Sequence, residues 1–239
     1  MKRALVTGAS GDLGRAIALR LAGAGLHVIA HANTRLAAAE DVVAQIRAAG
    51  GSAQAVAFDV TDAAASGEAL AKLLEEGTIQ VLVNNAGIHE DAVFPGMRAD
   101  QWQRVIDVSL HGFFHVTQPL TLPMLRTRWG RIISISSVAA VMGNRGQVNY
   151  AAAKSALHGA SKALSLELAS RGVTVNVVAP GIIASEMTAG LFDDKAIAQM
   201  VPAKRAGTPE EVAALVAFLA GEEAGYISGQ VISVNGGMA

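Results

Sequence analysis

Cysteine is absent from this chain of 239 residues, which excludes disulfides, thiolate chemistry and cysteine-based metal sites. Aromatic residues make up only 4% of the chain and charged residues 16%, and the formal net charge is −1. Such a balance gives no electrostatic argument for binding nucleic acid or a membrane surface. The six histidines do not cluster with carboxylates at metal-site spacing, so we expect no metal.

Long apolar runs are also missing, and none approaches the length of a membrane-spanning helix. An apolar run begins almost at Met1, so no signal or transit peptide is expected. Hydrophobic residues nevertheless make up 51% of the chain, which is typical of a tightly packed soluble protein. The length allows one large α/β domain or two small ones. Together these features favour a cytoplasmic enzyme.

Short apolar runs alternate with helical patterns along the whole chain. Strands are expected at residues 3–7, 27–31, 53–58, 80–83, 131–136, 173–179 and 230–234. Near-continuous apolar strands separated by helices indicate a parallel sheet covered on both faces. Because we find no linker and no repeat, we expect a single doubly wound domain over residues 1–239.

Several helix ends carry recognisable signals. Thr61 is a candidate N-cap, and Thr208 followed by Pro209 predicts the start of the last helix. A helix is expected over residues 99–126, with Pro119 and Pro123 bending or breaking it. Residues 185–206 are expected to form a partly helical, flexible substrate lid.

A glycine-rich turn follows the first strand. It runs Gly8-Ala9-Ser10-Gly11-Asp12-Leu13-Gly14 and leads into a helix. Such turns let the backbone approach a pyrophosphate at the N-terminus of the helix. An ordinary tight turn between a strand and a helix is the alternative.

Other polar or glycine-containing segments also stand just past strand ends. They are Asp59-Val60, residues 84–87, Ser137 and Pro180-Gly181. In a parallel sheet these ends share one edge, where ligands of doubly wound folds bind. Their convergence predicts a binding site at that edge.

Tyr150 and Lys154 are four residues apart, so a helix places them on one face. An ammonium near a phenol favours the phenolate, and we expect Lys154 to lower the pKa of Tyr150. The pair would then donate or accept a proton near neutral pH.

In this order, these motifs resemble the short-chain dehydrogenase/reductase family over essentially the whole chain, with its doubly wound (Rossmann) fold. Asn149-Tyr150-Ala151-Ala152-Ala153-Lys154, residues 175–181 and the ending 234–238 most resemble its 3-oxoacyl-acyl-carrier-protein reductases. The resemblance implies that Tyr150 passes a proton to the substrate carbonyl. Lys154 assists it and holds the nicotinamide ribose, and Ser137 positions the carbonyl.

The resemblance also implies the residues that bind the cofactor. They are Gly8, Ser10, Gly11, Asp12, Leu13, Gly14, Asn33, Thr34, Arg35, Asp59, Val60, Asn85, Ala86, Gly87, Tyr150, Lys154, Pro180, Gly181, Ile183 and Ser185. Of the serines near the fifth strand, Ser137 lies beyond its end and is preferred as catalytic. Ser134 and Ser136 are interpreted as strand filling.

Two residues depart from the family pattern. Asp12 stands where the turn usually has glycine, and we expect it to cap the helix and face away from the phosphates. Ser109 stands where a fourth catalytic residue, asparagine, normally holds a water near the lysine. Serine can also bind water. A relay with an extra water and a weakened relay therefore both remain open.

The end of the second strand carries no acid to accept a ribose 2′-hydroxyl and repel a phosphate. Asn33, Thr34 and Arg35 can instead donate hydrogen bonds or charge, which favours NADPH. Arg35 as a solvated residue at a helix start is the alternative. His31 could touch the adenosine end, although an exposed loop histidine is the preferred interpretation.

The substrate is less well defined. Arg128 and Arg171 match positions at which the resembling reductases contact an acyl carrier protein, or they are solvated surface charges. Residues 89–97, 141–147 and 187–200 are expected to line an apolar acyl site. By resemblance we expect a homotetramer.

The sequence favours NADPH-dependent reduction of a 3-oxoacyl thioester in fatty-acid, polyketide or polyene synthesis. A reductase or dehydrogenase for a free ketone or alcohol is the alternative. A weakly catalytic cofactor-binding partner is a third hypothesis, to which Asp12 and Ser109 point.

Overall fold

The computed structural model describes residues 1–185 and 193–239, and its centre is a sheet of seven parallel strands. The strands are β1 (Arg3–Val6), β2 (His27–Ala32), β3 (Ser52–Ala57), β4 (Val81–Asn84), β5 (Gly130–Ile135), β6 (Val173–Pro180) and β7 (Val231–Val234). They lie in the order β3-β2-β1-β4-β5-β6-β7. The expected doubly wound α/β fold, a Rossmann-type sheet, is confirmed.

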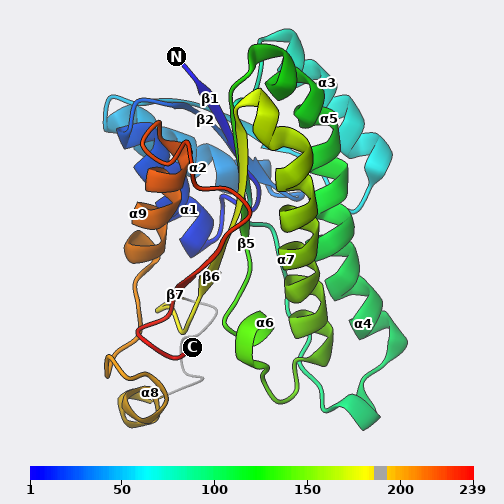
Figure 1. Cartoon of the computed structure of the whole chain (residues 1–239), viewed down its shortest axis with the longest axis vertical. Coiled ribbons are helices and arrows are strands. Elements are labelled where there is room, and N and C mark those ends of the chain that lie inside the picture. Colours follow the sequence, from blue (N-terminus) through cyan, green and yellow to red (C-terminus); the bar gives the residue numbers. More distant parts are fainter. Residues whose placement is uncertain (186–192) are drawn as a thin grey trace.

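Helices cover both faces of this sheet (Figure 1). One layer contains α1 (Asp12–Gly23), α2 (Leu36–Ala48) and α9 (Pro209–Ala220). The other contains α3 (Ala63–Glu75), α4 (Ala99–Ile106), α5 (Gly112–Thr127) and α7 (Val148–Leu168). The short helices α6 (Ala139–Met142) and α8 (Asp194–Met200) lie beyond the carboxyl ends of the strands, toward the bottom of Figure 1.

Aliphatic side chains line up across the middle of the sheet. Leu5 is in register with Ile29 and Leu82, and this row continues through Ile132 to Val175. All five are fully buried in the core shared with α3 and α5. Burial of each such side chain contributes about 1.5–3 kcal/mol, so this row anchors the register of the central strands.

The direction of winding reverses between β1 and β4. From β1 the chain proceeds to β2 and β3 on one side, and from β4 to β7 on the other. Ligands of doubly wound folds bind at the carboxyl edge beside such a reversal. The glycine-rich turn after β1 and the Asn85 segment after β4 therefore lie next to each other.

Two helix starts test the predicted caps. Thr208 and Glu211 form a reciprocal capping box at the start of α9, as expected from Thr208-Pro209. The N-cap of α3 is Asp62, whose carboxylate accepts from the Ala65 N–H at 3.0 Å, so Thr61 as the cap is wrong. The Asp59 carboxylate instead binds the N–H and hydroxyl of Thr61.

The helix expected over residues 99–126 is interrupted away from its prolines. Between α4 and α5, residues Asp107–His111 form a π-helical segment that contains Ser109. Pro119 and Pro123 both lie inside α5, so a break at these prolines is wrong, while a bend there stays a prediction. Segments of this kind are often found at functional positions.

Among residues 1–185 and 193–239, no helix is long and apolar enough to cross a membrane.

Candidate active site

The glycine-rich turn brings backbone very close to backbone. A Cβ on Gly14 would stand 2.2 Å from the Gly8 carbonyl oxygen and 2.8 Å from the Ala9 Cα. Gly8 itself has φ +64°, a conformation that side chains disfavour. The turn therefore requires glycine at both positions, and it leaves the N-terminus of α1 without a side-chain cap. Free N–H groups at such a terminus suit a pyrophosphate.

Asp12 is not the cap that we expected. Gly11 is the N-cap of α1, and Asp12 is the first helical residue. An acid in this first turn interacts favourably with the helix dipole. The orientation of Asp12 relative to bound phosphates stays a prediction.

Asn85 and Thr7 join the turn to the end of β4. The Asn85 side-chain amide donates to the carbonyls of Thr7 and Gly8 at 2.9 and 3.1 Å. The Thr7 hydroxyl accepts from the N–H groups of Asn85 and Ala86, both at 3.0 Å. Gly87 continues toward Lys154, whose Nζ would lie 3.0 Å from a Cβ on this glycine. One edge thus connects the phosphate turn to the lysine.

Two further groups flank this edge. Asp59 and Val60 follow β3, and the Asp59 carboxylate accepts from the Thr61 N–H at 2.9 Å. Asn33, Thr34 and Arg35 follow β2 and are all exposed, so their polar groups face solvent.

The segment after β6 closes the edge on the other side. The Gly181 N–H donates to the Val234 carbonyl at 2.9 Å, and the Val138 N–H donates to the Pro180 carbonyl at 2.7 Å. Ile183 is buried and pairs with Gly207 as an isolated bridge. Ser185 is the last described residue before 186–192, so that part of the expected lid and acyl lining lies outside the described residues.

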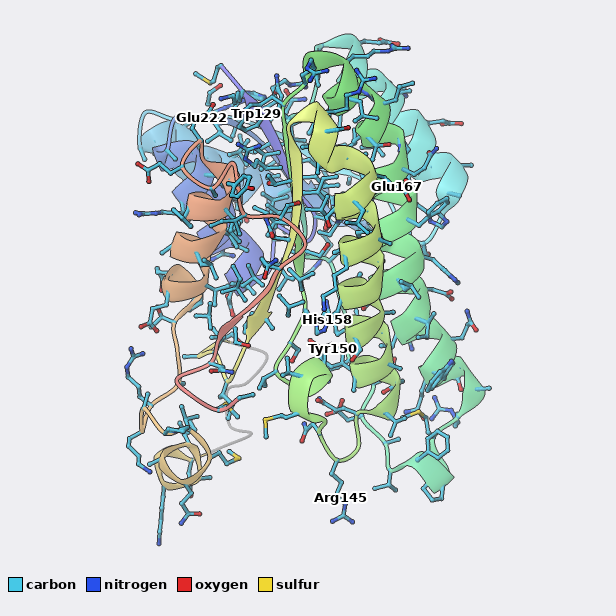
Figure 2. The ribbon with its side chains drawn as sticks, in the orientation of Figure 1. Trp129, Arg145, Tyr150, His158, Glu167 and Glu222 are labelled. Carbon is cyan, nitrogen blue, oxygen red and sulfur yellow. The ribbon has the colours of Figure 1, made fainter. Side chains whose placement is uncertain are left out.

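Ser137, Tyr150 and Lys154 converge beside β5. Ser137 stands just past the strand. Its Oγ accepts from the Ala139 N–H at 3.2 Å, and its hydroxyl lowers the pKa of the neighbouring Tyr150 phenol. Lys154 is buried one turn further along α7, with Nζ 5.8 Å from the Tyr150 ring centroid. Its ammonium donates to the Ile135 carbonyl at 2.8 Å. The predicted shared face of the helix is therefore present, and Figure 2 shows Tyr150 on α7 near the carboxyl edge of the sheet.

The pKa of Tyr150 is raised, whereas we expected it to be lowered. Burial raises the pKa of its phenol, the Asp91 carboxylate raises it further, and the Ser137 hydroxyl partly offsets both. Burial also lowers the pKa of Lys154 to about 8. The expected lowering of the Tyr150 pKa by Lys154 is therefore wrong in this structure, where the ammonium is held by the Ile135 carbonyl.

Ser109 is buried on the π-helical segment. Among the described residues its hydroxyl has no hydrogen-bond partner. It faces a cavity with about 10 Å³ of room for a water centre, which Lys154, Asn84 and Thr7 also line. This is close to the space that one water molecule needs.

Of the two serines interpreted as strand filling, sequence reasoning missed the role of Ser136. Ser134 is buried without a partner among the described residues, which agrees with strand filling. Ser136, however, donates to the Lys154 carbonyl at 3.1 Å and pairs with His158 Nε2 at 2.7 Å. His158 lies four residues beyond Lys154, and this spacing was the available signal. The pair fixes the lysine turn of α7 against β5.

Hydrogen bonds join the two loops that contain Asp91 and Gln147. The Gln147 amide donates to the Asp91 carboxylate at 3.0 and 3.1 Å, and the Ala92 N–H donates to the Gly146 carbonyl at 2.9 Å. These loops belong to the regions expected to line the acyl site. Their exposed large apolar side chains are Val93, Phe94, Val141 and Met142.

Arg128 and Arg171 lie at the other end of α7. The Arg128 guanidinium donates to the Ser170 carbonyl at 3.3 Å, and Arg171 is exposed directly beside Ser170. Figure 2 labels Trp129, next to Arg128, near the top and Tyr150 well below it. Since α7 has 21 residues and is about 30 Å long, the two arginines are remote from Tyr150 in the same chain.

No group of three or more histidine, aspartate or glutamate side chains in residues 1–185 and 193–239 is arranged to hold a metal ion.

Comparison with known proteins gives the family of this chain. The family model for short chain dehydrogenases matches residues 2–196. The chain belongs to the short chain dehydrogenase family, as the motif order had indicated, and it is an oxidoreductase. Membership implies a nicotinamide cofactor, which the glycine turn and the uncapped N-terminus of α1 fit.

Curated relatives are similar over almost the full chain. The 3-oxoacyl-[acyl-carrier-protein] reductase FabG of Aggregatibacter actinomycetemcomitans is 44% identical over 236 residues, covering 98% of both chains. The 3-oxoacyl-[acyl-carrier-protein] reductase of Synechocystis sp. is 48% identical over 237 residues, covering 98% of this chain and 96% of the relative. FabG of Escherichia coli (strain K12) is 46% identical over 240 residues, covering 99% of this chain and 97% of the relative. The enzyme is thus of the type that these reductases represent.

Proposed function

We propose that this enzyme uses NADPH to reduce a 3-oxoacyl thioester, carried by an acyl carrier protein, to the 3-hydroxyacyl thioester. The observation that carries the proposal is the convergence of Ser137, Tyr150 and Lys154 at the edge that holds the glycine turn. Its relatives' names support the substrate class.

The side chains divide the work around the substrate carbonyl. Bound NADPH supplies a hydride to the carbonyl carbon. The Ser137 hydroxyl holds the carbonyl oxygen, and Tyr150 gives its phenolic proton to that oxygen as negative charge develops there. The raised pKa of Tyr150 keeps this proton in place at neutral pH, which suits the reducing direction. Lys154 holds the nicotinamide ribose and supplies positive charge beside the phenol.

We assign the remaining cofactor contacts from the residues of the same edge. The turn from Gly8 to Gly14, including Ser10 and Leu13, would hold the pyrophosphate, and Asp59 and Val60 would hold the adenine. Asn85, Ala86 and Gly87 would contact the adenosine ribose, and Pro180, Gly181, Ile183 and Ser185 would contact the nicotinamide. The exposed Asn33, Thr34 and Arg35 contact the 2′-phosphate, since no acid stands there to repel it.

Ser109 takes the place of the asparagine that usually completes such sites. The buried hydroxyl and the cavity beside Lys154 support a bound water there. We propose that this water passes a proton from solvent toward Lys154 after Tyr150 has given up its own.

Arg128 and Arg171 are proposed to contact the acidic carrier protein. Because they are remote from Tyr150 in one chain, we propose that a docked carrier serves the site of a neighbouring copy. This arrangement requires an oligomer, and a homotetramer remains our proposal. We propose that residues 1–239 act as one unit. The enzyme would work in the cytoplasm, in fatty-acid or polyketide synthesis.

The test compares NADPH with NADH oxidation, using a 3-oxoacyl thioester on carrier protein, for wild type and Tyr150→Phe. NADPH should be preferred, and Tyr150→Phe should lower kcat by about 10²–10⁴-fold with the NADPH Kd little changed. Equal use of NADH would refute the cofactor assignment.

Two alternatives give different outcomes in the same assay. Faster turnover of free ketones than of carrier-linked thioesters would favour a reductase for free substrates. NADPH binding without turnover on any 3-oxoacyl thioester would favour a weakly catalytic cofactor-binding protein.

A further inference from the structure

His31 is a buried histidine at the carboxyl end of β2, only 1% exposed. The interpretation of His31 as an exposed loop histidine is therefore wrong. A buried imidazole needs partners for both ring nitrogens, because an unpaired polar atom in the interior is costly. Both partners of His31 belong to the edge at which the cofactor is proposed to bind.

The first partner is the glycine turn. The Gly8 N–H donates to His31 Nδ1 at 3.1 Å, and the Ala9 N–H donates to the His31 carbonyl at 2.8 Å. The Gly8 carbonyl is already held by the Asn85 amide at 3.1 Å. His31 thus fixes the N–H of Gly8, whose positive φ shapes the turn.

The second partner is the segment after β3. His31 Nε2 lies 2.8 Å from the Phe58 carbonyl, and the imidazole packs on the Phe58 ring with centroids 4.2 Å apart. Asp59 and Val60, the proposed adenine contacts, follow directly. The imidazole therefore spans the distance between the phosphate turn and the adenine corner.

These contacts define one tautomer. Because Nδ1 accepts from Gly8, Nε2 must carry the hydrogen that is donated to Phe58. Burial lowers the pKa of His31 to about 4, although the Phe58 carbonyl and the Asp59 carboxylate act in the opposite direction. The ring is thus neutral at neutral pH, and Nδ1 remains available as an acceptor.

We propose that His31 is a positioning residue for the dinucleotide, holding the phosphate turn and the adenine corner at a fixed separation through its neutral Nε2–H tautomer. This inference rests on the proposed binding of NADPH at this edge. His31 does not reach the reacting carbonyl, so it acts on cofactor affinity and leaves the rate of the bound complex unchanged.

Two substitutions separate the two contacts. The Oδ1 atom in His31→Asn can replace Nδ1 as the acceptor for Gly8 while losing the Phe58 bond. The terminal amide in His31→Gln can replace Nε2–H as the donor to Phe58 while leaving the Gly8 N–H without its acceptor. The NADPH Kd, measured by cofactor fluorescence, and kcat at saturating NADPH are determined for both variants and for wild type.

We expect His31→Gln to raise the NADPH Kd by about tenfold and His31→Asn by about threefold or less. In both variants kcat should stay within about twofold of wild type. Unchanged Kd values in both variants, a larger effect of Asn than of Gln, or a loss confined to kcat would overturn the inference while leaving the proposed function intact. If wild type bound no NADPH, the proposed function would fail, and the inference with it.

A second measurement on the wild-type protein applies even if a variant does not fold. Imidazole nitrogen NMR at neutral pH should show His31 with its hydrogen on Nε2 and a hydrogen-bonded Nδ1 acceptor. A hydrogen on Nδ1, or a doubly protonated ring, would overturn the proposal.

Discussion

At the scale of single residues, burial sets the chemistry of this enzyme more than the neighbouring charges do. Burial raises the pKa of Tyr150 and lowers the pKa of Lys154 to about 8 and that of His31 to about 4. Each shift favours the neutral form of the side chain. The site thus holds a protonated phenol and a neutral imidazole at neutral pH.

Ser109 allows a test of the proposed water. Ser109→Ala removes the buried hydroxyl and should lower kcat by about tenfold, with a changed pH–rate profile, because the water loses a partner beside Lys154. Ser109→Asn is the matched variant and should retain activity, since its amide can still hydrogen-bond a water beside Lys154. An alanine variant with wild-type kcat and pH profile would rule out a relay through Ser109.

His31 predicts how stability depends on pH. Its folded-state pKa of about 4 lies below the usual value of 6.5, so the unfolded chain binds more protons between these values. The stabilising contribution is therefore complete above pH 6.5 and is lost as the pH falls toward 4. Between pH 7 and pH 5 the free energy of unfolding should fall by about 2 kcal/mol more in wild type than in His31→Asn. Urea unfolding at both pH values gives this difference. An equal fall in the free energy of unfolding in wild type and His31→Asn would contradict the prediction.

At the scale of elements, the glycine turn and the π-helical segment place backbone where a regular helix or strand would not. The turn brings the Gly8 carbonyl against Gly14, and the π segment inserts Ser109 beside Lys154. Both features stand at the carboxyl edge of the sheet. The glycine turn and the π-helical segment thus give the site its shape, whereas the regular strands and helices hold these two segments in place.

Gly14→Ala tests the turn. The new Cβ would meet the Gly8 carbonyl oxygen at 2.2 Å, so the turn must open and NADPH affinity should fall by at least about tenfold. Gly23→Ala at the other end of α1 is the control, because a Cβ there meets nothing within 4 Å. That variant should bind NADPH normally and gain up to about 1 kcal/mol of helix stability. Titration of both proteins with NADPH, with urea unfolding, checks the prediction, and similar affinity in Gly14→Ala would refute it.

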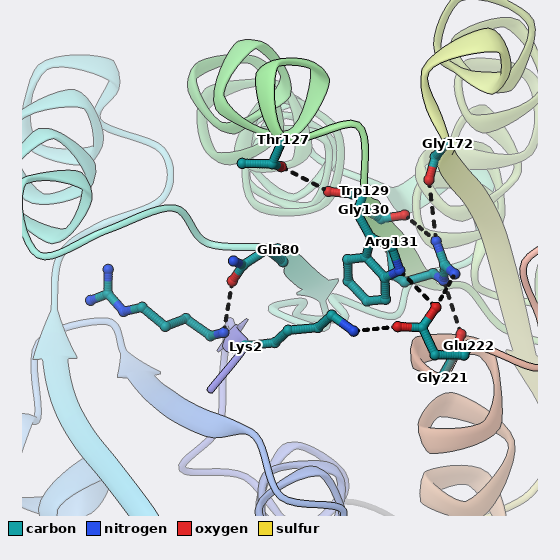
Figure 3. A network of polar contacts seen from close by, with 10 residues as sticks. Lys2, Gln80, Thr127, Trp129, Gly130, Arg131, Gly172, Gly221 and Glu222 are labelled. Atoms are coloured by element: carbon teal, nitrogen blue, oxygen red, sulfur yellow. Dashed lines mark hydrogen bonds and ion pairs between the residues drawn. The ribbon is translucent and has the colours of Figure 1, made fainter.

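At the scale of the whole molecule, the carboxyl and amino ends of the strands carry different kinds of polar residue. The carboxyl edge carries the proposed catalytic residues, while a polar network closes the amino edge (Figure 3). Arg131 is buried there and donates to the carbonyls of Gly221 and Gly172 at 3.1 and 3.3 Å. Lys2 and Arg131 lie 4.0 and 4.2 Å from the Trp129 ring centroid, and Glu222 binds Lys2 and the Trp129 indole. This network joins β1, β5 and the end of α9.

Arg131→Met should lower the free energy of unfolding by about 2–4 kcal/mol, because it removes a buried guanidinium that donates to the buried Gly130 carbonyl and to the part-buried carbonyls of Gly221 and Gly172. Glu222→Gln, at an exposed carboxylate, should cost less than about 1 kcal/mol. Both variants should keep wild-type kcat, since the network lies at the edge opposite Tyr150. Urea unfolding and initial rates provide the measurements. Equal stability losses in the two variants would contradict the greater weight given to the buried cation.

The sequence alone determined the order of the elements and the position of the site. Apolar strands separated by helices lead to a parallel sheet, and glycine and polar residues after those strands must meet at one edge. Tyr150 and Lys154 share a helical face because of their spacing. These inferences depend on local pattern and period, which a sequence displays directly.

Only the tertiary structure decided what surrounds each side chain. The pKa of Tyr150 depends on burial, on Ser137 and on Asp91, and the pKa of His31 depends on burial and on Phe58 and Asp59, which follow β3. The helix break at residues 107–111, the cap at Asp62 and the separation of Arg128 from Tyr150 likewise arise from packing between distant segments. Desolvation and long-range contacts depend on which segments meet in space, and no local pattern in the sequence contains that information.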